Sequence, residues 1–107
     1  MPKRIQQKTE LGVGETEAVA IDYQDHLDTG ELLTGTPTVT EASGTLTLGS
    51  KAVNTAALTI LGRSVAIGQA VQFTAAGAAL GVKYVFTITV STDAGRVLVR
   101  EAVCEGV

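Results

Sequence analysis

The fold is decided by residues 82–100, VKYVFTITVSTDAGRVLVR. From Val82 to Val90 every second residue is apolar, whereas Lys83, Thr87 and Thr89 occupy the intervening positions. A period of two places alternate side chains on opposite faces of a strand. The stretch therefore predicts a long strand with one buried face.

A turn follows this strand and predicts a hairpin. Residues 92–95 fit a four-residue loop built on a type I turn, in which Gly95 supplies a positive φ. Such a loop pairs Ile88 with Val99. A shift by one residue would place Arg100 opposite Ile88 instead, so the hydrophobic pattern favours the first register.

The rest of the chain predicts further short strands, and Pro37 marks a strand start or an edge because it cannot donate a ladder hydrogen bond. The strands are expected at residues 16–23, 38–40, 45–48, 57–61 and 65–74. A chain of 107 residues with 12 glycines and 4% aromatics suits one domain of small β-forming side chains. These features predict an all-β fold, a β-sandwich of about seven antiparallel strands.

A flexible basic arm is predicted over residues 1–14, ahead of a folded domain over residues 15–107. Its basic side chains are Lys3, Arg4 and Lys8. The arm is either a solvated tail or a segment that docks on an acidic neighbour, such as another copy of the chain. Three charges without interleaved aromatics do not make the basic stripe that nucleic acids require, so no nucleic-acid partner is expected.

An acidic segment overlaps the end of this arm and continues beyond it. Between Glu10 and Glu41 there are eight acidic residues and no Lys or Arg. The candidate contact residues within it are Asp22, Asp25 and Asp28, which we expect to face basic surface, including the arm of a neighbouring copy. Their spacing lacks the alternating oxygen ligands and turn glycine of a calcium loop, so no metal site is expected.

The side chains best suited to chemistry do not predict an active site. His26 has no partner nucleophile identifiable from spacing. Cys104 is the single cysteine, which excludes an intrachain disulfide and a cysteine metal cluster and fits a reducing cytoplasm. No phosphate-binding loop, secretory signal or membrane span is evident. We therefore expect a protein that is not an enzyme, holds no cofactor and does not contact a membrane.

Several short motifs are distributed over residues 15–103. They are the run 16–23 with its Asp22-Tyr23 pair, Gly30-Glu31, Thr38-Val39, Gln72-Phe73, Gly81-Val82-Lys83-Tyr84 and the closing Ser91-Thr92-Asp93-Ala94-Gly95-Arg96. Together they resemble the immunoglobulin-like virion proteins of tailed bacteriophages, which include tail-fibre adaptors, head-tail adaptors and neck proteins. The chain departs from that pattern at His26-Leu27 and Phe73, where the family usually has tryptophan, a residue that often anchors interfaces.

The resemblance implies an immunoglobulin-like sandwich that is a non-enzymatic structural component of a phage virion. It would act as an adaptor at the neck or tail and link the tail machine to fibres. Its partners would be copies of itself in a symmetric assembly and other phage structural proteins of the tail, portal-proximal region, fibre or capsid. Assembly would take place in the host cytoplasm.

Two other functions are compatible with the sequence. One is a capsid decoration (cement) protein of the phage head. The other is an adhesion-type binding module, because residues 67–75 resemble one strand of bacterial immunoglobulin-like adhesion repeats. The scarcity of aromatic platforms for sugar stacking disfavours the adhesion module.

Overall fold

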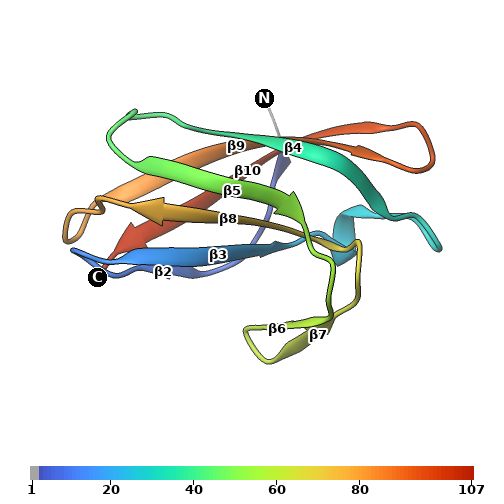
Figure 1. The fold of residues 1–107 in the computed structure, drawn as a ribbon, viewed down its shortest axis with the longest axis horizontal. Helices are drawn as coiled ribbons and strands as arrows, with labels where there is room; N and C mark the ends of the chain where they lie inside the picture. The colour runs from blue at the N-terminus through green and yellow to red at the C-terminus, as the bar shows by residue number, and fades with distance from the viewer. Residues whose placement is uncertain (1–2) are drawn as a thin grey trace.

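The computed structural model describes residues 3–107, which form strands joined by turns and one short 3-10 helix, η1 (Gln24–His26) (Figure 1). The strands are β1 (Lys3–Arg4), β2 (Thr9–Leu11), β3 (Thr16–Asp22), β4 (Leu33–Glu41), β5 (Thr47–Val53), β6 (Leu58–Ile60), β7 (Arg63–Val65), β8 (Ala70–Ala76), β9 (Lys83–Thr92) and β10 (Val97–Gly106). The predicted all-β sandwich is confirmed. Within the described part of the chain, no helix is long and apolar enough to cross a membrane.

The sandwich has two main sheets and a separate hairpin. One sheet has the order β1-β10-β9-β4, with β2 also paired to β10, and the other has the order β3-β8-β5. This arrangement matches the immunoglobulin topology, in which strands B, E and D form one sheet and G, F and C the other. Residues 3–107 form ten strands rather than about seven, and β1 and β2 run parallel to β10 instead of antiparallel.

The two extra parallel strands come from the segment predicted as a flexible arm. Lys3 and Arg4 pair with β10 at one end, and residues 9–11 pair with it at the other. Ile5 and Leu11 are buried and supply the apolar contacts for this placement. Met1 and Pro2 lie outside the described residues. Contact between the arm and another chain, and the domain boundary at residue 14, stay predictions.

The core lies between the two sheets. The rings of Phe73 in β8 and Phe86 in β9 pack across it with centroids 5.1 Å apart. Ile21 of β3 and Ile88 of β9 are also fully buried. As predicted, alternate residues of β9 from Tyr84 onward face this core.

The register predicted for the terminal hairpin is wrong by one residue. Arg100, rather than Val99, lies opposite Ile88. The loop is one residue shorter than expected, because the Thr92 N–H donates to the Arg96 carbonyl and Gly95, with φ of 85°, completes a three-residue turn. Shortening the loop moves every residue of β10 to the opposite face, so Val99 points outward and Arg100 inward.

A tyrosine fixes the connection between β8 and β9. The hydroxyl of Tyr84, near the start of β9, accepts a hydrogen bond of 2.7 Å from the Ala79 backbone N–H. A tyrosine at this position that bonds to backbone a few residues upstream is the tyrosine corner of immunoglobulin-like sandwiches. It supports the topology independently of the strand order.

Candidate interaction surfaces

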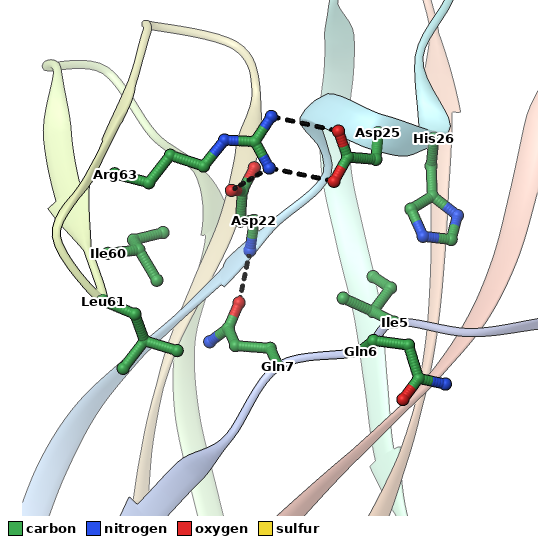
Figure 2. Close-up of a pocket in the computed structure, with 9 residues that line it drawn as sticks. All are labelled: Ile5, Gln6, Gln7, Asp22, Asp25, His26, Ile60, Leu61 and Arg63. Carbon is green, nitrogen blue, oxygen red and sulfur yellow. Dashed lines mark hydrogen bonds and ion pairs between the residues drawn. The ribbon is translucent and has the colours of Figure 1, made fainter.

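A cleft of about 280 Å³ lies between the β6–β7 hairpin and η1 (Figure 2). Arg63 of β7 donates to both carboxylate oxygens of Asp25, at 2.9 and 3.0 Å, and lies 3.5 Å from Asp22. These hydrogen bonds and the guanidinium charge lower the pKa of Asp25. Two of the three candidate aspartates therefore fasten the hairpin to the body of the domain.

One wall of this cleft is formed by residues 5–7, which connect β1 to β2. The Gln7 side chain donates to the Ala20 carbonyl at 2.8 Å and accepts the Asp22 N–H at 2.9 Å. The Gln7 side chain thereby makes the hydrogen bonds that a neighbouring strand would make with part of the outer edge of β3. A partner strand could not pair with this part of the edge without displacing Gln7.

The third candidate, Asp28, lies in a second charged cluster built around Glu31. The carboxylate of Glu31 is buried and accepts hydrogen bonds from Arg96 Nε at 2.9 Å and Thr92 Oγ1 at 2.6 Å. These hydrogen bonds lower the pKa of Glu31 to about 2, and the bond from Arg96 has the largest effect. Asp28 lies 3.9 Å from Arg96 and donates its backbone N–H to Glu31.

This cluster joins two of the motifs that carry the phage-protein resemblance. Gly30-Glu31 and the turn Thr92–Arg96 are about 60 residues apart in sequence, yet they meet at one end of the sandwich. A reciprocal pair reinforces the contact, because Asp93 accepts the Leu32 N–H at 3.0 Å and donates its own N–H to the Leu32 carbonyl at 2.9 Å. These two motifs therefore hold the loop before β4 against the turn of the terminal hairpin.

Among residues 3–107, the basic candidates form no ion pair with the candidate aspartates. Lys3, Arg4 and Lys8 are exposed, and Arg4 forms an ion pair with Glu101 of β10. The ion pairs of Asp22, Asp25 and Asp28 are made to Arg63 and Arg96 of the same chain instead. Contact between these acidic and basic groups across two copies stays a prediction.

The two side chains considered for chemistry are both engaged by the fold. His26 accepts a hydrogen bond at Nδ1 from Arg100 Nε, at 2.8 Å, and its pKa is lowered by burial and by the Arg100 charge. Cys104 is fully buried, which raises the pKa of its thiol to about 12. Within residues 3–107, no group of three or more His, Cys, Asp or Glu side chains could hold a metal ion.

An open groove of about 470 Å³ lies between β4 and β5. Its floor is organised by Asn54, whose Oδ1 accepts backbone N–H groups of residues 68, 69 and 70 at 3.0 to 3.1 Å. Asn54 also donates to the carbonyls of Ala56 and Ala66. Beside the groove, Pro37 lies where the ladder of edge strand β4 is interrupted, which fits the edge position predicted for it.

Exposed apolar side chains occur at three further places, one of which is the outer face of β10 with Val97 and Val99. Leu61, at the tip of the β6–β7 hairpin, is 70% exposed. At the opposite end of the sandwich, backbone hydrogen bonds among residues 11–13, 81–82 and 106–107 gather a group of exposed apolar side chains. This apolar end consists of Val13, Leu80, Val82 and Val107.

Sequence reasoning did not identify Arg63, Asn54 or Leu61. Arg63 is 38 residues from Asp25, and no local pattern links them. Asn54, at the end of a strand, carried a detectable signal because asparagine commonly bonds backbone groups at turns. Leu61-Gly62 also resembles a tight turn, although leucine is not a residue that such turns favour.

Comparisons with known proteins add one match. A model of the family described as "Podophage GP4 fiber-tail adaptor protein gp77" matches residues 12–105. The matched region includes β3 to β9, nearly all of β10 and all three candidate aspartates. Comparison with curated proteins gives no match.

Proposed function

The chain belongs to the podophage GP4 fiber-tail adaptor family, and from this membership and the geometry above we propose how it works. It is a structural component of a phage particle that joins fibre and tail. The observation that carries this conclusion is the family match over residues 12–105, almost the whole sandwich. The match favours the adaptor over the decoration protein and the adhesion module.

The adaptor acts by static contact and not by catalysis. Two features support this part of the proposal. His26 Nδ1 is occupied by the Arg100 guanidinium, and burial keeps the Cys104 thiol protonated. The acidic net charge of −3 further supports a protein that binds other proteins of the particle and not nucleic acid.

The two ends of the sandwich suit two different partners. One end is charged and carries the Arg63 and Arg96 clusters, whereas the apolar end carries Val13, Leu80, Val82 and Val107. An adaptor has to touch two structures at once, and chemically distinct ends allow each contact to be specific. We assign one end to the tail and the other to the fibre, with several copies assembling around them in the host cytoplasm.

Five of the six charged candidates act at the rim of these contacts. The side chains of Asp25 and Asp28 remain 74% and 82% exposed despite their arginine partners, and Lys3, Arg4 and Lys8 are also exposed. Asp22 lies deeper, with 14% of its side chain exposed, and supports Asp25 through Arg63. Rim charges of this kind set orientation and association rate, so assembly should weaken as salt rises.

Particles produced without this protein test the proposed function. We expect complete tails that lack fibres, counted by negative-stain electron microscopy, and recovery of fibres when the purified chain is added. The variants His26→Ala and Cys104→Ala should restore fibres once their folding is verified by circular dichroism. Particles that retain all fibres without the chain would contradict the adaptor function, and loss of activity in either folded variant would contradict the static mechanism.

A further inference from the structure

We propose that the β6–β7 hairpin of one copy inserts its tip into the β4–β5 groove of a second copy, so that copies join side to side. The inference rests on the proposed function, in which several copies work together. It adds the surfaces by which they meet.

The hairpin tip combines a strained backbone with an exposed apolar side chain. Leu61 and Gly62 both have positive φ, of 50° and 78°, and connect β6 to β7 as a two-residue turn. Such type I′ turns favour Asn, Asp and Gly, because a leucine side chain is strained at positive φ. Leu61 is also 70% exposed. Strain combined with an exposed apolar side chain points to a contact made outside the chain.

The hairpin is held in a fixed position. Within the part of the chain that the structure describes, its strands pair only with each other, and an isolated two-stranded hairpin is marginally stable in water. Arg63 ties it to Asp25, and Gln24 Nε2 donates to the Ser64 carbonyl at 2.9 Å. Because these bonds brace the hairpin before any partner arrives, little conformational entropy is lost when the tip docks.

The groove offers a complementary apolar surface. Leu32 and Ile67, which line it, are 39% and 57% exposed, and Val53 at the end of β5 also lines it. Asn54 holds the surrounding loops through five hydrogen bonds, so the groove is formed in the free chain. The ladder between β4 and β9 is interrupted from Thr34 to Thr38, which leaves backbone outside regular pairing beside the groove.

The two surfaces lie on different flanks of one domain. The hairpin contacts β3, whereas the groove borders β5, and these strands form the two opposite edges of the three-stranded sheet (Figure 1). A contact between different surfaces is heterologous, and its repetition gives a ring when the rotation closes. Charge is also complementary, because Lys51 lines the groove, whereas the carboxylates of Asp22 and Asp25 beside the hairpin outnumber their shared partner Arg63.

Cysteine cross-linking tests this contact. Leu61→Cys and Ile67→Cys chains are mixed at high concentration and treated with a short bis-maleimide linker, and dimers are quantified by gel and mass spectrometry. We expect the linked heterodimer to form at least ten times faster than in the control mixture of Leu80→Cys and Ile67→Cys. Leu80 is a matched control because it is 77% exposed and lies at the apolar end. The native Cys104 is fully buried and should not react.

The same variants in assembled particles separate this inference from the proposed function. If the Leu61→Cys and Ile67→Cys pair reacts no faster than the control, both in solution and in particles that still carry fibres, the contact between copies is wrong and the adaptor function stands. Linkage of Leu61→Cys to a different virion protein would likewise overturn the inference. Linkage to Ile67→Cys of a neighbouring copy would support it.

Discussion

The two hairpins of this domain differ in almost every physical respect. The β9–β10 hairpin consists of two ten-residue strands, places Phe86 and Ile88 in the core, and turns at a glycine. The β6–β7 hairpin has three-residue strands outside both sheets and turns at a strained, exposed leucine. The first hairpin serves the stability of the fold, whereas the second costs stability and is kept for contact with a partner.

The largest effect should come from the core face of the terminal hairpin. Phe86→Ala should lower the free energy of unfolding by about 3–5 kcal/mol, because it removes a fully buried ring that packs on Phe73. Val97→Ala on the outer face of the same hairpin is the control and should change it by less than about 0.5 kcal/mol. Urea denaturation measures both. Equal effects would mean that the observed register is incorrect.

A pH-dependent effect should come from the turn of the same hairpin. The pKa of Glu31 is lowered from 4.5 to about 2 in the folded chain, so its contribution to stability is complete above pH 4.5 and is lost as the pH falls toward 2. The melting temperature of the wild type should therefore fall as the pH is lowered from 4.5 toward 2. Glu31→Gln should be less stable at pH 7 and should lose part of the acid dependence, whereas Asp28→Asn should retain it.

A local effect should come from Arg63, the first residue after the turn of the β6–β7 hairpin. Arg63→Gln removes the bonds to Asp25 but touches no core residue, so the midpoint of global unfolding should change little. Hydrogen exchange in residues 58–65 should become faster, while exchange in β9 and β10 stays the same. If the whole domain exchanges faster, the hairpin is part of the cooperative core and the distinction between the two hairpins fails.

The sequence was sufficient for the fold class and for the buried face of β9, because a period of two is a local signal. It was not sufficient for the hairpin register, which depends on a single residue of loop length. Arg100 was excluded from the inner face on its charge, but the three-residue loop turns it inward, where His26, 74 residues away, accepts its Nε hydrogen bond. Such a partner is visible only once the chain is folded.

The same reason limited the prediction of the candidate surfaces. The parallel pairing of β1 and β2 depends on Ile5 and Leu11, two apolar residues separated by polar ones that form no recognisable strand pattern. Asp22 and Asp25 were identified as a pair of interest, yet their partner Arg63 lies beyond three intervening strands. The sequence therefore indicated which side chains were of interest, but not which distant residues they contact.

The most direct test of the division between a stabilising and a contacting hairpin is the variant Leu61→Asn. Asparagine tolerates positive φ, so relief of strain should stabilise the free domain by about 1 kcal/mol while removing the apolar tip. The account predicts that the melting temperature rises and that incorporation into particles falls, with Leu80→Asn as the matched exposed control. A lower melting temperature, or full incorporation of Leu61→Asn, would contradict it.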